Sequence, residues 1–333
     1  MPLFRSGDVP YFLATSKHFY TIRLFRERVS GGRTALTPVP YETLLSTRRR
    51  IGGIIFGDID RLVGPTAQQM GRFAELMQAQ LPSGAVLNHP TRSMRRYELL
   101  RNLHARGINS FNVYRLSEAR EPSHYPVFVR RDSGHDGAAS DPLPDRHALD
   151  REIQRMLAQG APRDDILIVE YLDYQSPDGM FRKYGAYLIG DRFIPFQIEI
   201  ADKWVVKVPT IVTPETVEEE MAYVGGGADG HEALLRDVFA MANIQYGRID
   251  YTLVDGRPQI FEINTNPVIL GPRSKVRERR PIFNHVMPRI RRAFDAIDAV
   301  ARARSPFGRR RKRWVRGGNV ATSGTRAIGG QAT

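Results

Sequence analysis

Two acidic residues and one amide occupy strand-like positions where a packed sheet would carry apolar side chains. The stretch YGRIDYTLVDGRPQIFEINTNPVI consists of two hydrophobic runs on either side of an Asp-Gly turn. Asp250 lies in the first run, and Glu262 and Asn264 lie in the second. Because residues two apart in a strand share a face, Glu262 and Asn264 should point the same way. Phe261 and Ile263 should point to the opposite face.

The register of this hairpin decides whether the polar faces of its two strands coincide. A two-residue loop at Asp-Gly would place Asp250 opposite Phe261. A three-residue loop at Asp-Gly-Arg would place Asp250 opposite Glu262. The same register would pair Arg248 with Asn264. We expect the three-residue loop, which is a common hairpin form.

The expected register brings two carboxylates together across the strands. At a Cβ separation of roughly 5 Å, like charges directly opposite each other destabilise a sheet, so a positive partner should lie between them. Two carboxylates and an amide offer the oxygen ligands that suit Mg²⁺ bound to nucleotide phosphates. The alternative is a solvated hairpin face that is balanced by Arg248 and Arg257.

The hairpin sequence RIDYTLVDGRPQIFEINTNP resembles the metal-binding strand pair of ATP-grasp enzymes. That superfamily includes D-alanine:D-alanine ligase, glutathione synthetase and the ribosomal-protein glutamate ligases. The resemblance implies that Asp250, Glu262 and Asn264 hold one or two Mg²⁺ ions, with Mn²⁺ as an alternative, against the phosphates of ATP. It also implies that Arg248 faces the phosphate that is transferred.

The stretch YPVFVRRDSGHDGAAS resembles the ATP-grasp strand and flexible loop that reach the phosphates. The resemblance places Arg130, Ser133, Gly134, His135 and Gly137 at the nucleotide. Glycines allow a close backbone approach, and backbone N–H groups there could bind phosphate oxygens. The alternative for this Asp-Ser-Gly loop is an ordinary turn between strands.

Two arginines depart from the ATP-grasp pattern, which usually has lysine at these positions. One is Arg130 in the PVFVR strand, and the other is Arg96, early in the preceding helix. Arginine keeps the positive charge but is bulkier and binds phosphate in a forked geometry. Their neighbours Arg131 and Arg95 are alternatives for the same roles.

Two further stretches carry the remaining nucleotide contacts that the resemblance implies. ILIVEYLD resembles the segment between the lobes, so that Glu170, Tyr171 and Leu172 would read the adenine. Asp173 or Asp178 would reach the ribose. By itself this segment would be read as a buried strand.

DKWVVK resembles the strand that offers another basic side chain to the phosphates. Lys207 is the candidate there, with Lys183 as a further candidate on the neighbouring strand. The alternative for both is a solvated lysine at a sheet edge. A separate stretch, FGDIDRL, contains Asp58 and Asp60 after a strand. We interpret it as a turn with two capping acids, with a glycosyltransferase-like DxD motif as the weaker alternative.

Hydrophobic spacing and turn residues predict the elements that must position these side chains. Strands are expected at residues 18–28, 51–56, 85–88, 110–115, 126–131, 166–172, 181–189 and 192–200. Helices are expected at residues 64–82, 93–107, 145–160, 214–223, 229–243 and 282–303. Pro288 should kink the last helix.

The resemblance implies an α/β (α+β) chain with the ATP-grasp fold, in which two lobes sandwich ATP. The implied divisions are an N-terminal α/β domain at 1–88, a small lobe at 89–172, a C-terminal lobe with the metal site at 173–304, and a basic tail at 305–333.

Composition limits the classes of protein that fit. The chain has 41% hydrophobic and 26% charged residues, which is ordinary globular usage. Without cysteine it can form neither a disulfide framework nor a thiolate metal site. No apolar run approaches the roughly 20 residues that span a bilayer. We therefore expect a cytoplasmic protein with no membrane span.

The net charge of +13 is concentrated at the C-terminal end. Residues 305–333 and residues 271–304 each contribute +7, which leaves −1 for residues 1–270. A nucleic-acid-binding role for the whole chain therefore loses its main support. The tail sequence GRRRKRWVRGG could make a weak polyanion contact. A solvated, disordered end is the alternative.

The resemblance implies an ATP- and Mg²⁺-dependent ligase that forms an amide or thioester-like bond through an acyl phosphate. Its substrates would be small-molecule or peptide carboxylates and amines, and Arg248 and Lys207 would be its catalytic cations. One alternative is a kinase that phosphorylates a hydroxyl group. The other is a nucleotide-binding protein with little turnover, which the arginines at positions 96 and 130 favour.

Overall fold

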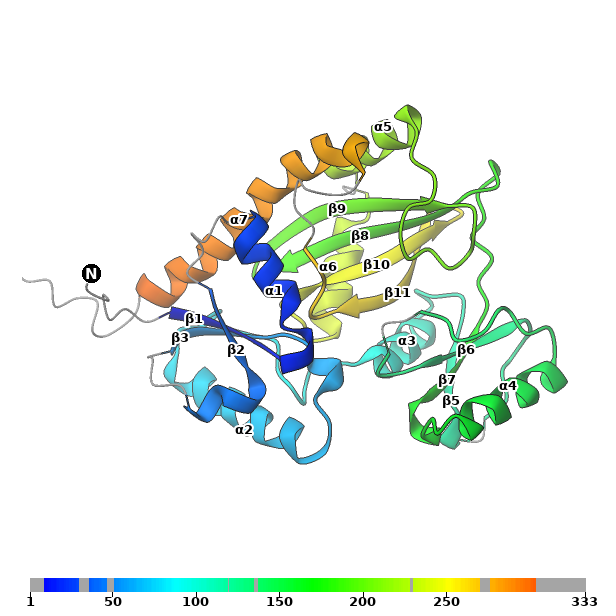
Figure 1. Cartoon of the computed structure of the whole chain (residues 1–333), viewed down its shortest axis with the longest axis horizontal. Coiled ribbons are helices and arrows are strands. Elements are labelled where there is room, and N and C mark those ends of the chain that lie inside the picture. Colours follow the sequence, from blue (N-terminus) through cyan, green and yellow to red (C-terminus); the bar gives the residue numbers. More distant parts are fainter. Residues whose placement is uncertain are drawn as a thin grey trace, which may run out of the picture.

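The computed structural model describes most of the chain and shows three sheets with helices packed around them (Figure 1). The described residues are 9–29, 36–46, 51–118, 120–134, 137–227, 230–269 and 276–303. The basic tail and His135, both singled out above, lie outside these ranges. Within them, no helix combines the length and apolar character needed to cross a membrane.

The N-terminal sheet is parallel, with strand order β2-β1-β3-β4. Its strands are β1 (Val9–Ala14), β2 (Thr37–Pro40), β3 (Ile51–Phe56) and β4 (Val86–Leu87). Helix α2 (Gly64–Gln80) connects β3 to β4, as predicted, and has Pro65 in its first turn. Proline is tolerated there because the first N–H groups of a helix have no intrahelical partner. The buried face of α2 packs on this sheet.

The strand predicted at residues 18–28 is wrong, because that segment is helical. It forms a 3-10 turn, helix α1 (Tyr20–Leu24) and a π-helical turn (Phe25–Val29). Ile22 and Phe25 lie three residues apart and are both buried, which is the spacing of one helix face. Strand propensity depends on sheet context. Here packing against helix α7 (Arg280–Ala303) decides instead, as in the contact between the rings of Phe25 and Phe294 at 4.8 Å. The sequence prediction also missed β1 and β2.

The second sheet is antiparallel, with order β5-β7-β6. It consists of β5 (Val113–Arg115), β6 (Val127–Arg131) and β7 (Ile166–Glu170). Helix α4 (Arg146–Ala158) covers it and begins at Asp145, whose carboxylate accepts a hydrogen bond from the N–H of Ala148 at 2.9 Å. We call β5, β6, β7 and α4 the small lobe.

Helix α3 (Arg96–Ala105) precedes the small lobe and starts three residues later than predicted. The hydroxyl of Ser93, the expected first residue, donates to the carbonyl of Asn243 instead of capping the helix.

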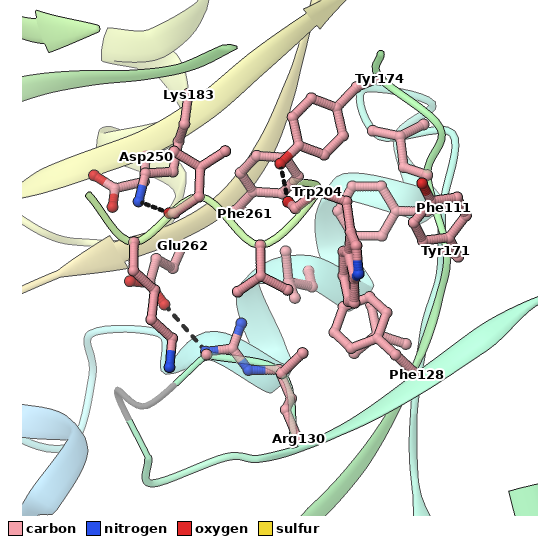
Figure 2. Close-up of a pocket in the computed structure, with 18 of the residues that line it drawn as sticks. Phe111, Phe128, Arg130, Tyr171, Tyr174, Lys183, Trp204, Asp250, Phe261 and Glu262 are labelled. Atoms are coloured by element: carbon pink, nitrogen blue, oxygen red, sulfur yellow. Dashed lines mark hydrogen bonds and ion pairs between the residues drawn. The ribbon is translucent and has the colours of Figure 1, made fainter. Parts of the chain in front are cut away.

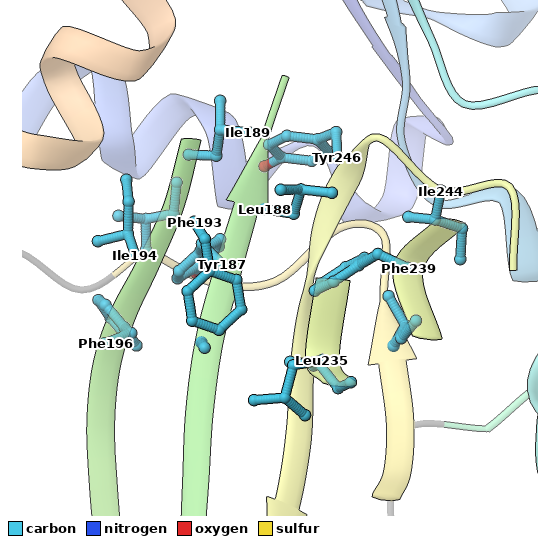
Figure 3. Packing of buried hydrophobic residues seen from close by; sticks show 14 of the residues in the cluster. Tyr187, Leu188, Ile189, Phe193, Ile194, Phe196, Leu235, Phe239, Ile244 and Tyr246 are labelled. Atoms are coloured by element: carbon cyan, nitrogen blue, oxygen red, sulfur yellow. The ribbon is translucent and has the colours of Figure 1, made fainter. Parts of the chain in front are cut away.

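The third sheet is antiparallel, with order β11-β10-β8-β9. Its strands are β8 (Phe181–Ile189), β9 (Arg192–Ala201), β10 (Tyr246–Val254) and β11 (Arg257–Asn264). Its helices are α5 (Pro214–Ala222), α6 (Glu232–Met241) and α7 (Arg280–Ala303). We call these elements the large lobe. Figure 3 shows its core, where side chains of β8 and β9, such as Phe196, pack near those of α6, such as Phe239.

The hairpin of β10 and β11 has the predicted pairs but not the predicted loop. Asp250 lies opposite Glu262. The turn, however, contains only Asp255 and Gly256, whose φ angles are 49° and 72°. Positive φ at both central residues is the geometry of a two-residue type I′ turn. The three-residue loop that we expected is therefore wrong.

A β-bulge restores the pairing that the two-residue turn would otherwise prevent. The register shifts between Asp250 and Tyr251, and Phe261 is the extra residue without a partner in the ladder. Phe261 consequently lies on the same side as Glu262 and contributes to the same pocket (Figure 2). The expected alternation of these two side chains was wrong for this reason.

Long-range contacts join the N-terminal sheet to the large lobe. Helix α7 packs on β1 and β3 as well as on β9 (Figure 1). Asn88, which follows β4 and is buried, bridges the two units. Its Nδ2 donates to the carbonyls of Phe56 and Tyr246, both at 2.9 Å. Its Oδ1 accepts from the N–H groups of Gln245 at 2.8 Å and Tyr246 at 2.9 Å.

We predict that Asn88→Asp lowers the free energy of unfolding by about 3 kcal/mol, measured by urea denaturation. A carboxylate cannot donate, so two buried carbonyls would face a negative charge. Asn102→Asp is the matched control, because the amide of Asn102 donates to a single carbonyl on the exposed side of α3. Equal losses in the two variants would contradict the bridging role.

Candidate functional site

A pocket of about 290 Å³ lies between the small and large lobes. Its walls come from β6 and β7 on one side, from β8, β10 and β11 on the other, and from residues 204–207 after β9. Figure 2 shows aromatic rings gathered at one end and charged side chains at the other. This division suits a ligand with a flat apolar part and an anionic part.

The aromatic end is built around Trp204. Its ring meets those of Phe128 and Tyr171 edge-on, with centroid distances of 5.0 Å and 5.4 Å. Tyr174 donates its hydroxyl to the carbonyl of Trp204 and packs on Phe261 at 5.4 Å. Rings from both lobes therefore enclose this end of the pocket.

The sequence analysis named Tyr171 but missed other aromatic residues that line the pocket, among them Trp204, Phe128, Tyr174 and Phe261. Trp204 lies within DKWVVK, three residues before Lys207, so the signal was in a stretch already singled out. Phe128 likewise lies within the PVFV strand. Phe261 was assigned to the other face because a bulge cannot be seen in a regular alternation.

At the charged end, Arg248 and Asp250 form an ion pair within β10. The Arg248 Nε lies 2.6 Å from Asp250 Oδ1, and its Nη2 lies 2.9 Å from Oδ2. Both side chains are largely buried. Burial disfavours the guanidinium charge, but the carboxylate of Asp250 outweighs it and raises the pKa of Arg248 above its usual value. The fork-like geometry fixes both groups.

Glu262 pairs with Arg96 and Arg130, the two arginines singled out in the sequence. Its Oε2 lies 2.6 Å from Arg96 Nη2 and 3.4 Å from Arg130 Nη2. Burial and the neighbouring Arg96 charge lower the pKa of Arg130 to about 10, although Glu262 opposes this shift. Two like charges therefore crowd one carboxylate in a largely buried site, and Arg130 carries the less stable charge.

The two candidate lysines differ in their surroundings. Lys207 lines the pocket beside Gly137, where an added Cβ would lie 2.8 Å from Lys207 Cε. The φ angle of +85° favours glycine at that position, whereas the flexible end of Lys207 could move aside. Lys183 also lines the pocket, but its Nζ lies 2.7 Å from Glu199 Oε2 and donates to the carbonyl of Val206. Its charge is already balanced.

Glu170 lies at the pocket wall, but its carboxylate is committed to the small lobe. Its side chain is 1% exposed. Oε2 accepts from the N–H of Asn112 at 2.7 Å, and Oε1 accepts from the hydroxyl of Tyr114 at 2.7 Å and the N–H of Ser123 at 2.9 Å. Tyr171 and Leu172, the next residues, also line the pocket.

Among the described residues, four other expected nucleotide residues do not line the pocket: Ser133, Gly134, Asp173 and Asp178. The N–H of Ser133 donates to Asp165 Oδ1 at 2.9 Å, and the carbonyl of Gly134 accepts from Arg96 at 3.0 Å. Asp178 pairs with Arg182 at 2.7 Å.

Asp173, the other ribose candidate, accepts from the N–H of Gln175 at 3.1 Å in the same turn region. Neither ribose candidate lines the pocket. Asp173 lies near one pocket residue, Tyr171, whose pKa is raised by burial and by the charge of Asp173.

The two acids of FGDIDRL have different surroundings, and the expected pair of capping acids is wrong for Asp58. Its buried carboxylate makes no cap hydrogen bond but accepts from the N–H of Thr15 at 3.2 Å and pairs with Arg61. Asp60 has no such partner within the described residues. Burial raises the pKa of Asp60 to about 6. The charge of Arg96 opposes this shift, and the charge of Glu262 adds to it.

The chemistry of the hairpin residues fits a divalent metal ion. Among the described residues, no three His, Cys, Asp or Glu side chains cluster, so the candidate set is two carboxylates and one amide. Asp250 and Glu262 are directly paired across the strands, and both line the pocket with Asn264. Oxygen donors of this kind, completed by phosphate oxygens, suit Mg²⁺.

Comparisons with solved structures identify the fold. The D-alanine-D-alanine ligase from Coxiella burnetii matches with a TM-score of 0.51 at 12% identity, covering 87% of this chain and 96% of the ligase. VanG D-Ala:D-Ser ligase from Enterococcus faecalis matches with a TM-score of 0.50 at 13% identity, covering 89% and 100%. The chain has the ATP-grasp fold. No protein-family model matches it, and neither does any curated protein sequence.

The ATP-grasp fold was expected from the hairpin sequence, and its α/β character is confirmed. At this low identity the likeness extends to the fold, so the roles of individual residues must be argued from the geometry above.

We predict that Asp60→Asn raises the free energy of unfolding at pH 7.5 by on the order of 1 kcal/mol. A raised pKa means that the folded state holds the proton more tightly, so ionisation of Asp60 lowers stability as the pH rises from about 4, and the loss is complete above about 6. The gain should shrink as the pH falls from about 6 to about 4 and vanish below about 3, where Asp60 is protonated in both states. Urea denaturation between about pH 3 and pH 8 measures it.

Asp58→Asn is the matched control for this prediction. It removes a carboxylate that is satisfied by Thr15 and Arg61, so it should lower stability at pH 7.5. A loss of stability in Asp60→Asn at neutral pH would contradict the prediction.

Proposed function

We propose that the protein is an ATP- and Mg²⁺-dependent ligase that joins a carboxylate to an amine through an acyl phosphate. The observation that carries the proposal is the bulged hairpin. It sets Asp250 opposite Glu262 and Arg248 opposite Asn264 at the charged end of a pocket whose other end is aromatic. The ATP-grasp fold supports the proposal, because the compared structures are named as ligases.

In this proposal the aromatic end takes the adenine ring. Trp204, Phe128 and Phe261 supply ring surfaces, which bind a planar base without regard to its polar groups. Leu172 lies two residues beyond the end of β7 and lines the pocket, so its backbone groups would read the edge of the base. The carboxylate of Glu170 acts indirectly by fixing the position of this segment.

Arg130 and Lys207 bind the phosphates at the charged end, and Arg248 faces the phosphate that is transferred. The cations around the pocket would neutralise the charge that builds up during transfer. Asp250, Glu262 and Asn264 would hold Mg²⁺, which supplies further charge neutralisation when it is bound. To do so, Asp250 and Glu262 must exchange part of their contact with arginines for contact with the ion.

The proposed chemistry has two steps. An oxygen of the substrate carboxylate attacks the terminal phosphorus of ATP, and the bond to the bridging oxygen breaks to release ADP. The amine nitrogen then attacks the carbonyl carbon of the acyl phosphate, loses a proton and expels inorganic phosphate. The N-terminal unit would supply the acceptor side, since the N–H groups of Asp58 and Ile59, just after β3, donate to Thr265, directly after Asn264.

We predict that Glu262→Gln lowers acceptor-stimulated ADP release by about 100-fold in the presence of Mg²⁺. The assay scans amino acids and small carboxylates as acceptors, and mass spectrometry identifies the product. Glu218→Gln, an exposed change on α5, is the matched control and should retain wild-type activity. Equal activity of the two variants would remove the hairpin from the mechanism.

The same assay separates the proposal from its rivals. Acceptor-stimulated ADP release without a new amide or thioester bond would identify a kinase. Binding of Mg·ADP without any turnover would identify a nucleotide-binding protein. Gain of activity in Arg130→Lys would then attribute the lack of turnover to Arg130.

A further inference from the structure

Arg96 is engaged by the protein at both terminal nitrogens, and its side chain is 5% exposed. Its Nη1 donates to the carbonyls of Arg131 at 3.3 Å, Asp132 at 2.6 Å and Gly134 at 3.0 Å. Its Nη2 donates to Glu262 Oε2 at 2.6 Å. One side chain of α3 thus ties the segment after β6 to strand β11.

The same segment is held from its other side by Asp165. The carbonyl of Asp165 accepts from the N–H of Asp132, and its Oδ1 accepts from the N–H of Ser133, both at 2.9 Å. Arg115 adds an ion pair to the Asp132 carboxylate at 2.7 Å. Because C=O and N–H point in opposite directions across a trans peptide, carbonyls that face Arg96 leave amides that face Asp165. These backbone groups are already hydrogen-bonded within the protein, before any ligand binds.

Arg130 presents the opposite case. Its guanidinium lines the pocket, and its contact with Glu262 is long, at 3.4 Å. Its Nε is buried without a hydrogen-bond partner in the described part of the chain. The Nε of Arg96 is buried in the same way, but Arg96 is not among the pocket-lining residues. An anionic ligand group would therefore meet Arg130 first, where it would stabilise a poorly paired charge.

We propose that Arg96 is a positioning residue that braces residues 131–134 against Glu262, so that Arg130 is held in place to meet the anionic group of the ligand. The ligand's identity as a nucleotide rests on the proposed function, whereas the brace belongs to the ligand-free protein. Lysine cannot replace Arg96 here, because one ammonium nitrogen cannot reach three carbonyls and a carboxylate that are bound by two separate nitrogens.

The test compares Arg96→Lys, Asp165→Ala and Arg130→Met in the full chain. Hydrogen exchange of residues 131–134 is measured without ligand, and the affinity for ADP is measured by calorimetry without metal at several salt concentrations. Exchange of β10 and β11 amides shows whether the rest of the fold is intact.

For Arg96→Lys we expect exchange of residues 131–134 to rise about tenfold while the hairpin keeps its protection. ADP affinity should fall about tenfold, with the salt dependence of the wild type, because no ligand contact has been removed. Asp165→Ala loosens the same segment from the other side and leaves Arg96 in place, so it should give the same pattern. Arg130→Met should instead leave exchange unchanged and lower both the affinity and its salt dependence.

Arg96→Lys with wild-type exchange and wild-type ADP affinity would overturn the proposal, because the contacts of Arg96 with residues 131–134 and Glu262 would then position nothing that the ligand needs. Asp165→Ala with faster exchange but unchanged ADP affinity would also overturn it, because the brace would then have no effect on the ligand. If wild-type protein binds no ADP, the proposed function fails. The brace then stands if Arg96→Lys frees residues 131–134 and falls if it does not.

Discussion

The β-bulge at Phe261 is the constraint on which the site depends. A two-residue turn closes the hairpin with little strain because Asp255 and Gly256 both adopt positive φ. Without an extra residue, that turn would set Asp250 opposite Phe261. The bulge shifts the ladder by one residue, so that Asp250 meets Glu262 and Phe261 joins the aromatic end. One local irregularity therefore creates both the charged and the apolar ends of the pocket.

Charge is the second organising feature. Asp250 and Glu262 face each other across two strands, which would be destabilising if nothing lay near them. Arg248 neutralises the first carboxylate, and Arg96 and Arg130 neutralise the second. Since the arginine fork offers more donors than an ammonium, these pairs are fixed in geometry as well as balanced in charge. The result is a preorganised cluster in which Arg130 has the fewest satisfied contacts.

Packing between the units holds this cluster in place. The small lobe supplies Arg130 and the aromatic rings of Phe128 and Tyr171, while the large lobe supplies the hairpin and Trp204. The N-terminal sheet is locked to the large lobe by Asn88 and by the core around α7. Asp58 and Asp60 lie two residues apart but have different surroundings. The carboxylate of Asp58 is bound by Thr15 and Arg61, whereas Asp60 lies near Arg96 and Glu262 at the charged end.

The sequence by itself indicated most helices and the strands of the large lobe, because these follow from local periodicity. The ATP-grasp fold was implied by the resemblance of the hairpin stretch to that superfamily. The hairpin pairs were expected from a three-residue loop, whereas the structure reaches them through a two-residue turn and a bulge. The sequence could not determine that residues 18–28 are helical, because aromatic and β-branched residues fit a strand or a buried helix and only contact with α7 decides. Nor could it show the bulge, the aromatic role of Trp204 or the engagement of Arg96, since each depends on partners far apart in the chain. Only tertiary structure decides which charges and backbone groups already have partners, because hydrogen bonds and ion pairs form between groups that are close in space.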